Sequence, residues 1–506
     1  MNKTKIILVQ FAILLGIVMG CDTTEPPAPN NPVEINGVPD VSEVQVYESI
    51  GPLSIAAFGK DFLSSFRILK NGKEIEAWNL NHTDLKYFYT TFTYAPSPLE
   101  IGQDVLFEFE ARDMNGDVAK SEMRLNVLDL PNTIRISADI STDQTWESGK
   151  TYILSEQISV LPGATLTIQK GVIVKVDAEK EGEAIPFLVI ERGAKIMANG
   201  TQEAPIIFAS IFDKIQPGQI KSLFLPEAPS LYTYSAKGGL VILGKAKGSF
   251  VGDVSEVSLK GEDGSEYGLI YGGNDDQDNS GVLNYVSIRN VGPLTLAAVG
   301  SGTQIDKVEV YQGGQGGIRV LGGAVNLENI MVSYTGRGLS IDQGWNGTLE
   351  NFYLGDCWTS INVGGPKGSY YGGNHHIEKG SIFVSYGGSI LNFEENSNTD
   401  LSKIFFQFNG LTNDATFPPE GISYWANLVP STYKPEVREL EVYSLSPISS
   451  ENFLSWSDKV KILGSSEEVY PNVGVNLDPF EKWSVIRDIV FKPLIYNGPF
   501  HNGPGF

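Results

Sequence analysis

A repeat of fixed length constrains this chain more than any other feature of its sequence. Four segments, LNYVSIRNVG (283–292), IDKVEVYQGG (305–314), LENIMVSYTG (327–336) and LENFYLGDCW (349–358), each begin 22 residues after the one before. The first position is always Leu or Ile, and the fourth and sixth positions are apolar in every copy. A period in the low twenties with short apolar stretches is typical of a solenoid built from stacked coils.

The apolar positions predict that each coil is made of β-strands. Residues two apart in a strand point to the same face, so the fourth and sixth positions would stack about 4.8 Å from their equivalents in the next coil. Further short apolar stretches lie between the repeats, at 297–299, 318–320, 339–341 and 361–363. A leucine-rich repeat has a similar period, but its Leu-x-x-Leu-x-Leu pattern and helical segment are absent. We therefore predict a right-handed parallel β-helix over residues 134–430.

Two segments depart from the repeat. Residues 211–236 break the period and are predicted to form an inserted loop. Residues 431–506 lose the repeat and are predicted to cap the last coil, whose open strand edges must be covered. Trp456 and Trp483 would supply apolar surface for that cap.

Residues 35–130 have a different rhythm, in which apolar and polar residues alternate over short runs. Asn71-Gly72 and Asn115-Gly116 lie between such runs, and Asn-Gly in this position is a strong signal for a β-hairpin. About 95 residues of this kind predict a small immunoglobulin-like β-sandwich ahead of the β-helix. The whole chain is thus predicted to be all-β, in agreement with its 55 glycines and 19% charged residues.

Residues 1–20 have the pattern of a lipoprotein signal peptide. Two lysines precede a short apolar stretch at 6–19, and VMGC (18–21) follows the pattern of a bacterial lipobox. Cleavage before Cys21 would let that cysteine carry fatty acyl groups such as palmitate, which hold a protein on a membrane. Residues 21–34 are Pro-rich and are predicted to be an extended linker. We expect a lipid-anchored protein of the outer membrane, exposed at the cell surface, and the sequence leaves open which leaflet holds the anchor.

The charge of the chain excludes one class of partner. The sequence has 60 Asp and Glu against 37 Lys and Arg, for a net charge of −23. Nucleic acid binding needs a basic surface, so we expect no nucleic acid partner. Cys357 is the only cysteine besides Cys21, so no intramolecular disulfide is expected, and Cys357 is predicted to be a buried apolar residue.

Several motifs resemble one group of proteins. LPGATLTIQKGVIVKV (161–176), LVIERGAKIMANGTQEAPIIFAS (188–210), AKGGLVILGKA (236–246) and YGGNDDQDNSGVLNYVSIRNVG (271–292) resemble Gram-negative cell-surface lipoproteins of the pectin-lyase-like β-helix type. Lys237 departs from the pattern, since a tryptophan is expected before the Gly-Gly of the third motif. The resemblance implies the fold and the location. It implies little about activity, because the function of this group is mostly unassigned.

Three aspartates in YGGNDDQDNSG (271–281) are the strongest candidates for chemistry. Glycoside hydrolysis needs two carboxylates roughly 5–10 Å apart. Asp275 and Asp276 would point to opposite faces of a strand, whereas Asp276 and Asp278 could share one. The oxygen-rich segment also makes Asp275, Asp276 and Asp278 candidate calcium ligands, and no other cofactor is expected. The alternative is a polar turn, because Asp and Asn tolerate a left-handed backbone.

Other polar residues are candidates for lyase or metal chemistry. A lyase needs a cation and a base, and the basic candidates are Arg289, Arg319, Arg337 and Lys367. In the repeat, Arg289 and Arg319 are predicted to occupy outward strand positions, and single surface arginines are expected at this frequency without any catalytic role. Two adjacent histidines, His375 and His376, cannot easily chelate one metal ion from a strand, and no third ligand is evident in the sequence.

Aromatic residues provide candidates for ligand stacking. Trp358, Tyr370 and Tyr371 could stack on sugars or on a partner. The leading hypothesis is therefore a non-catalytic surface lipoprotein that binds a glycan or an envelope protein through its β-helix. The alternatives are a polysaccharide lyase or glycoside hydrolase, and an accessory subunit of an outer-membrane uptake or secretion complex. The sequence favours a non-catalytic protein over an enzyme.

Overall fold

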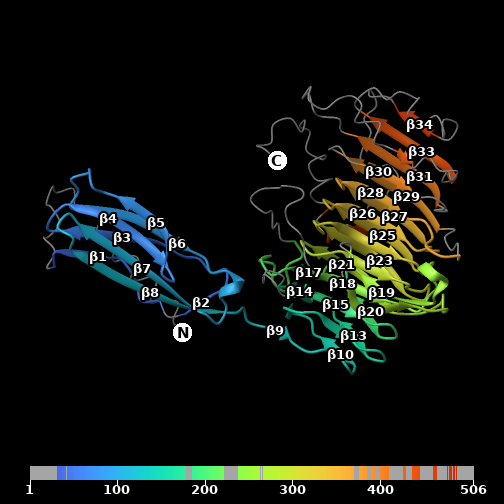
Figure 1. The fold of residues 1–506 in the computed structure, drawn as a ribbon, viewed down its shortest axis with the longest axis horizontal. Coiled ribbons are helices and arrows are strands. Elements are labelled where there is room, and N and C mark those ends of the chain that lie inside the picture. Colours follow the sequence, from blue (N-terminus) through green and yellow to red (C-terminus); the bar gives the residue numbers. More distant parts are fainter. Residues whose placement is uncertain are drawn as a thin grey trace. The chain divides into compact units, whose positions relative to one another are not determined.

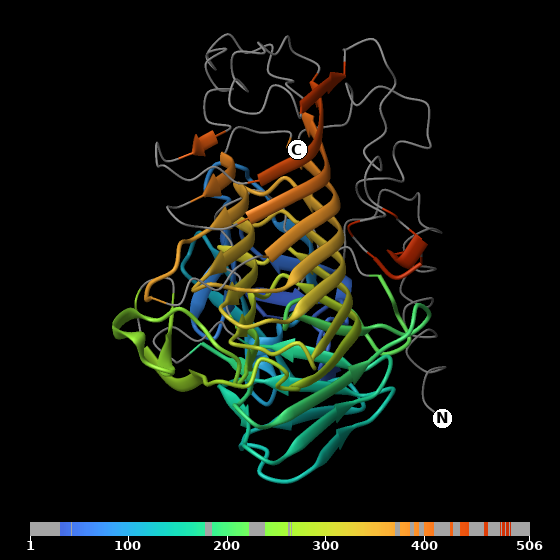
Figure 2. The same ribbon diagram turned by 90° about the vertical axis from the view of Figure 1, so that its right-hand side faces the viewer.

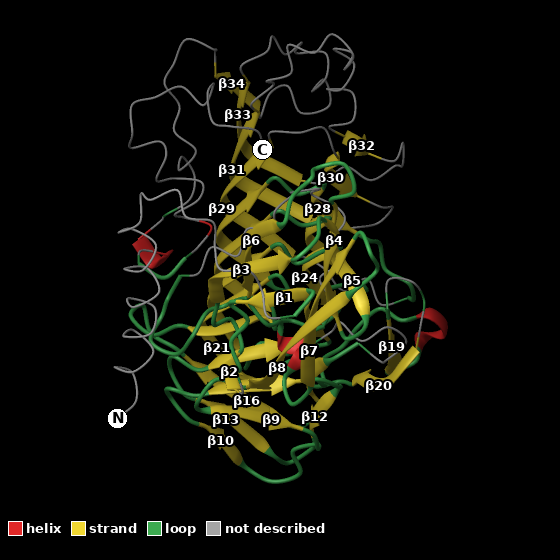
Figure 3. Cartoon of the chain, turned by 90° about the vertical axis from the view of Figure 1, so that its left-hand side faces the viewer, coloured by secondary structure: helices red, strands yellow, loops and turns green. Residues whose placement is uncertain are grey.

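In the computed structural model, the regular elements of the described residues are β-strands, apart from short helical turns (Figure 3). It divides into two compact units, Met1–Pro131 and Asn132–Phe506, and each is described by itself. The structure describes residues 31–41, 43–177, 185–221, 238–261, 264, 266–369, 375–384, 389–393, 399–408, 426–428, 436–444, 460–463, 476, 478–480, 482–484 and 486. Within these residues, no helix is long and apolar enough to cross a membrane.

The first unit consists of two sheets around a shared apolar core (Figure 1). The three-stranded antiparallel sheet contains β1 (Val33–Asn36), β3 (Ile50–Gly59) and β6 (Tyr87–Tyr94) in this order. The five-stranded sheet has the order β2 (Glu43–Gln45), β8 (Val118–Leu128), β7 (Asp104–Asp113), β4 (Leu63–Lys70) and β5 (Lys73–Asn79).

Local sequence explains how these strands are joined. The Asn71-Gly72 pair connects the antiparallel strands β4 and β5, as predicted, with φ of 50° and 77°. This two-residue turn needs positive φ at both positions, which Asn and Gly tolerate best. Phe66, Phe107 and Phe109 are fully buried between the sheets. The two small sheets are consistent with the predicted sandwich.

The second unit is a parallel β-helix, as predicted, and its strands stack as rungs in Figure 2. One long sheet has the order β9 (Thr133–Ile136), β11 (Thr151–Leu154), β14 (Ile173–Val176), β17 (Ile206–Ser210), β21 (Gly281–Arg289), β23 (Gln304–Tyr311), β25 (Asn326–Ser333), β27 (Thr348–Gly355), β29 (His375–Val384), β31 (Thr399–Phe408), β33 (Glu436–Ser444) and β34 (Val460–Leu463). Three further strands, β10 (Gln144–Trp146), β13 (Thr165–Ile168) and β16 (Lys195–Asn199), pair beside the first coils.

A second sheet, which we call the second parallel sheet, runs beside the long one. Its order is β12 (Ile158–Val160), β15 (Phe187–Ile190), β18 (Gly239–Leu243), β22 (Leu294–Ala297), β24 (Gly316–Leu321), β26 (Arg337–Asp342), β28 (Thr359–Val363), β30 (Ser389–Phe393) and β32 (Ala426–Leu428). Three of the four apolar stretches between the sequence repeats, 318–320, 339–341 and 361–363, therefore lie in strands of this sheet. The fourth, 297–299, overlaps its strand only at Ala297, because β22 lies three residues earlier than expected.

The 22-residue repeat sets the pairing register of the coils. Val286 pairs with Val308, Val308 with Ile330 and Ile330 with Phe352, so equivalent residues stack from coil to coil. These side chains are buried in one continuous core. Each such side chain contributes about 1.5–3 kcal/mol relative to leaving it in water.

Each long strand bends at one residue with a left-handed backbone. The bends lie at Tyr285, Lys307, Asn329 and Asn351, with φ of 51°, 54°, 53° and 54°, again 22 residues apart. Asn351 Nδ2 donates to Asn329 Oδ1 at 2.6 Å, and Asn329 Nδ2 donates to Asp306 Oδ1 at 2.7 Å. At two of these bends the residue is Asn, which tolerates positive φ better than most residues do.

The coil is interrupted by an antiparallel hairpin that sequence reasoning missed. Strands β19 (Glu256–Lys260) and β20 (Glu266–Gly272) form the hairpin, which is the yellow-green lobe beside the stacked strands in Figure 2. Tyr267 of the hairpin contacts Phe187 of β15, and their ring centroids are 5.5 Å apart. Its buried side chains pack on the outward face of the second parallel sheet with Val241, Leu321 and neighbouring residues.

The C-terminal part of the unit differs from the prediction. The coils do not end near residue 430, because β33 and β34 continue the long sheet in parallel. Trp483 packs on the side of the coils instead of capping their end. It belongs to an apolar cluster on the outward face of the long sheet, made of Tyr311, Met331, Tyr353, Phe480, Trp483 and Ile486. Trp456 and residues 222–236 of the predicted insertion lie outside the described residues.

Candidate functional site

The second parallel sheet presents a row of polar side chains on its outward face. Register places Arg319 beside Ser340, Ser340 beside Asn362, and Asn362 beside Asn392. We call these four residues the polar strip. Adjacent parallel strands are about 4.8 Å apart, so the strip is about 14 Å long. All four residues are partly exposed.

Alternation along each strand explains why these residues face outward. Arg319, Ser340 and Asn362 each lie between two apolar residues that are buried in the core. The side chains of a strand alternate between its two faces, so the middle residue must point outward. The short stretches 318–320, 339–341 and 361–363 carried this signal in the sequence, but only Arg319 was named from them, as an outward residue.

The strip offers hydrogen-bonding groups of several kinds. Asn392 Nδ2 donates to Asn362 Oδ1 at 2.6 Å, which fixes the orientation of both amides. Arg319 Nη1 donates to the carbonyl of Lys260 in the hairpin at 2.8 Å. Guanidinium, hydroxyl and amide groups in one row suit a ligand with many hydroxyl groups.

A second group of polar residues lies beside the strip. Tyr271 Oη of the hairpin donates to Gln343 Oε1 at 2.8 Å. Burial raises the pKa of Tyr271 to about 12, so its hydroxyl is protonated at neutral pH and can act as a donor but not as a base. Asp342 and Lys367 form an ion pair at 3.5 Å, and both side chains are about one-third exposed. The Asp342 carboxylate lies against Gly364, where a Cβ atom would be 2.5 Å from Oδ1.

Of the three aromatic candidates, the structure describes Trp358. Trp358 immediately precedes β28, and 51% of its surface is exposed. An exposed indole next to the start of a strand of the strip can stack on a ligand that lies along the sheet. Tyr370 and Tyr371 lie outside the described residues.

Two of the three aspartates accept hydrogen bonds from the backbone of a neighbouring loop, and the third closes a local turn. Asp276 Oδ1 accepts from the amide of Lys247 at 2.9 Å, and Asp278 Oδ2 accepts from the amide of Lys245 at 3.1 Å. Asp275 Oδ1 accepts from the amide of Gln277 at 3.1 Å, which closes a local turn. The carboxylates are therefore engaged in holding the loop after β18, as expected for a polar turn.

Among the described residues, these aspartates do not belong to an arrangement of metal ligands. In the part of the chain that the structure describes, no group of three or more His, Cys, Asp or Glu side chains could hold a metal ion. Asp276 also lies 3.4 Å from Lys247 Nζ, a cation that competes with a bound metal ion. Calcium binding by Asp275, Asp276 and Asp278 stays a prediction, and the observed contacts give it no support.

Arg289 is set apart from the other candidate lyase cations, because it lies on the long sheet, whereas Arg319, Arg337 and Lys367 lie on or beside the second parallel sheet. Arg289 points outward from its strand, as predicted, but it is only 1% exposed and is not a surface residue. Its Nε donates to Ser287 Oγ at 2.6 Å, its Nη2 lies 3.5 Å from Glu309 Oε1, and Ser484 Oγ donates to Glu309 Oε2 at 2.7 Å. Burial lowers the pKa of Arg289, against the opposing effect of Glu309. The C-terminal segment covers this group, which sequence reasoning could not foresee.

The two adjacent histidines point to different environments. His375 is buried, stacks on Trp345 with ring centroids 5.4 Å apart, and its Nε2 is 2.9 Å from Thr399 Oγ1. His376 is half exposed, and its Nδ1 is 2.8 Å from Asp400 Oδ2. The two rings therefore do not converge, as the sequence indicated.

Cys357 has the environment of a structural residue. It is buried in the core, and burial raises the pKa of its thiol to about 12. A thiol with this pKa is protonated at neutral pH and is a poor nucleophile. The predicted apolar role agrees with this environment.

Comparisons with known proteins agree with the fold. Residues 138–363 match the family model described as the pectate-lyase-like β-helix domain. No curated protein matches the sequence. The fold and this match define a protein with a pectate-lyase-like parallel β-helix.

Three solved structures are similar to parts of the chain. A family 28 exopolygalacturonase from Yersinia enterocolitica is 11% identical, with 82% of this chain and 86% of that chain covered and a TM-score of 0.23. A pectate lyase from Pectobacterium carotovorum is 11% identical, with 74% and 86% covered and a TM-score of 0.12. Fibronectin(III)-like modules from Clostridium thermocellum are 16% identical, with 19% and 97% covered and a TM-score of 0.14. The family match and the strand pairing carry the fold, and these structures assign no activity.

The contacts of Asp278 predict the effect of its removal. Asp278→Ala leaves the Lys245 amide without its acceptor, so we expect a loss of about 1–3 kcal/mol in the free energy of unfolding. Denaturant unfolding of the wild type and the variant, in chelator and in millimolar calcium, measures this loss. We expect the same loss in both conditions. A stabilisation by calcium that is present in the wild type and absent in Asp278→Ala would instead establish the cation site.

The burial of His375 predicts a pH-dependent stability. Its pKa is lowered from 6.5 to about 4, chiefly by burial, so the folded state disfavours protonation. The stabilising contribution is full above pH 6.5 and is lost as the pH falls from there through about 4, by about 3 kcal/mol in total. His375→Gln should remove this part of the pH dependence, whereas the exposed neighbour variant His376→Gln should keep it. Unfolding curves between pH 7 and 4 that are parallel for the wild type and His375→Gln would contradict this account.

Proposed function

We propose that the protein is a non-catalytic surface lipoprotein that binds a glycan along the polar strip of its β-helix. The observation that carries the proposal is the row of Arg319, Ser340, Asn362 and Asn392 on an outward sheet face. The row is partly exposed, in contrast to the outward face of the long sheet beneath Trp483. A glycan can accept and donate hydrogen bonds along the strip while Trp358 stacks on a sugar ring.

The proposal also rests on the contacts of the ionisable groups, which are hydrogen-bonded or buried. Asp276 and Asp278 accept from backbone amides, and Arg289 is buried beneath the C-terminal segment. The ion pair of Asp342 and Lys367 is neutral overall, and Arg319 is the one charged side chain among the four residues of the strip. A glycan of low charge density therefore fits the region better than a polyanion does.

The binding site is tested with the chain from residue 22 onward and a panel of soluble neutral and uronate-containing polysaccharides. Affinity electrophoresis should show binding that is about fivefold weaker in Asn362→Ala, which loses one hydrogen bond, and about tenfold weaker in Trp358→Ala. Gln304→Ala removes an exposed amide from the long sheet and serves as the matched control. Equal binding by the wild type and both strip variants would exclude this site.

Activity assays on the same panel separate binding from catalysis. We expect no release of reducing ends and no unsaturated products. Turnover that is lost in Asp276→Ala would favour the lyase or hydrolase alternative. A stable outer-membrane partner that copurifies with the lipidated protein, in the absence of glycan binding, would favour the accessory-subunit alternative.

The anchor is part of the proposal. Cys21 lies outside the described residues, and the lipobox pattern at 18–21 supports lipidation. Cells that express the wild type should incorporate labelled palmitate into the protein, and Cys21→Ser should not. Protease treatment of intact cells should degrade the anchored protein if it is exposed at the surface. Unlabelled wild-type protein in the soluble fraction would contradict this location.

A further inference from the structure

A second exposed region lies on the first unit, in the sheet formed by β1, β3 and β6. Ile55, Ala57 and Phe92 point into the core of that unit and are buried. The residues between them in β3 and β6 must therefore point outward. Register places Phe58 beside Tyr87 and Ala56 beside Tyr89 on this outward face.

Three aromatic rings gather at one end of the face. Phe58 contacts Tyr87 with centroids 5.7 Å apart and an interplanar angle of 75°, and it contacts Tyr89 at 6.0 Å and 88°. These edge-to-face contacts stabilise the cluster and fix the ring directions. Tyr89 nevertheless keeps 63% of its surface exposed. We call Phe58, Tyr87 and Tyr89 the aromatic cluster.

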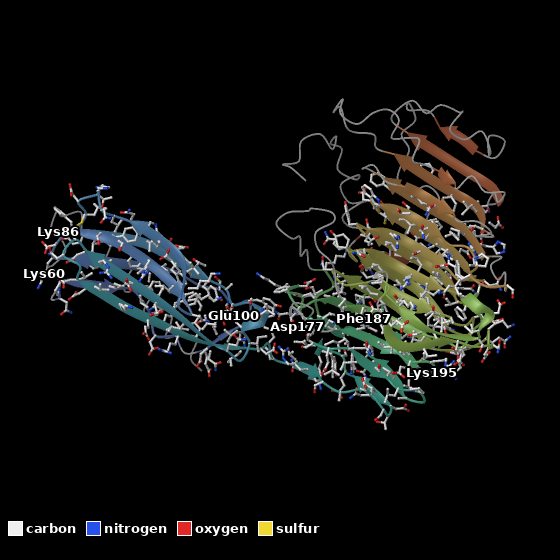
Figure 4. All side chains as sticks on the ribbon, viewed as in Figure 1. Lys60, Lys86, Glu100, Asp177, Phe187 and Lys195 are labelled. Carbon is white, nitrogen blue, oxygen red and sulfur yellow. The ribbon has the colours of Figure 1, made fainter. Side chains whose placement is uncertain are left out.

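The remainder of the same face is polar without being strongly charged. Its outward residues next to the aromatic cluster are exposed hydroxyl and amide side chains, namely Asn36, Ser54, Thr91 and Thr93. Among the outward side chains that β1 and β6 pair with Ser54, Ala56 and Phe58 of β3, only Glu34 is charged at neutral pH, and it lies beside Phe58. Lys60 and Lys86 flank the strand ends at the aromatic end of the face (Figure 4).

This composition favours one kind of occupant. The outward positions from Ser54 to Phe58 and from Tyr87 to Thr93 carry no aliphatic side chain larger than alanine. Ser and Thr are under-represented among the residues that dominate protein–protein binding. A sugar chain, by contrast, presents C–H faces that pack on aromatic rings and hydroxyl groups that pair with Ser, Thr and Asn side chains.

We propose that this face of the first unit is a carbohydrate-binding surface, separate from the polar strip, with Tyr89 as its principal stacking residue. The aromatic cluster packs against sugar rings, and the row of hydroxyl and amide groups orients the chain along the strands. The first unit then contributes to recognition instead of acting only as a spacer.

The experiment uses the chain from residue 22 onward and the same polysaccharide panel. Tyr89→Ala should weaken binding of at least one polysaccharide about tenfold, since loss of a stacked ring costs on the order of 1–3 kcal/mol. Tyr89→Phe should retain most of the affinity, because it keeps the ring. Ile75→Ala removes a side chain that is 44% exposed on β5 of the other sheet, and it should leave binding unchanged.

The variants also separate this surface from the polar strip. A polysaccharide that binds at the surface of Tyr89 should bind Asn362→Ala and Trp358→Ala at that surface as tightly as it binds the wild type. Unchanged affinity of Tyr89→Ala for every polysaccharide that the wild type binds would overturn the proposal, and so would failure of the wild type to bind any of them. Crosslinks from position 89 that reach an envelope protein and no glycan would overturn it as well, in favour of a protein partner. Circular dichroism of each variant confirms that the sheets remain folded.

Discussion

Register between successive coils is the constraint on which the rest of the β-helix depends. A shift by one residue would turn every core side chain outward, because side chains alternate between the faces of a strand. The stack of Val286, Val308, Ile330 and Phe352 excludes such a shift, since each of them is fully or almost fully buried. Once the inward residues are fixed, the outward residues are fixed as well. The polar strip is thus a consequence of the same register that builds the core.

Different segments of the chain cover the outward faces of the two sheets of the β-helix. On the long sheet, Trp483 and its neighbours cover Tyr311, Met331 and Tyr353, and the Arg289–Glu309 pair is buried beneath them. On the second parallel sheet, the hairpin of β19 and β20 covers the strands up to β24. The strip begins at Arg319, which still contacts the hairpin through the carbonyl of Lys260, and it continues from there to Asn392. Its partial exposure makes it the part of these faces best suited to contact a large ligand.

The sequence predicted the architecture better than it predicted the site. The spacing of 22 residues required coils, and the position of Asn71-Gly72 required a hairpin, because both signals are local. The role of Arg289 was not predictable, since its partners are Glu309, 20 residues away, and a segment almost 200 residues further along the chain. The extent of the coils beyond residue 430 was missed because the later strands no longer keep the fixed spacing. The amide contacts of Asp276 and Asp278 depend on a loop about 30 residues earlier, which no sequence pattern placed beside them.

Hydroxyl-radical footprinting of the protein with and without a bound polysaccharide tests most directly which face carries the ligand. The account predicts that Trp358 and the segment 359–367 lose reactivity in the complex, and that Gln304 on the long sheet does not. Protection of the aspartate loop at 275–278, with unchanged reactivity of Trp358 and its segment, would contradict the account.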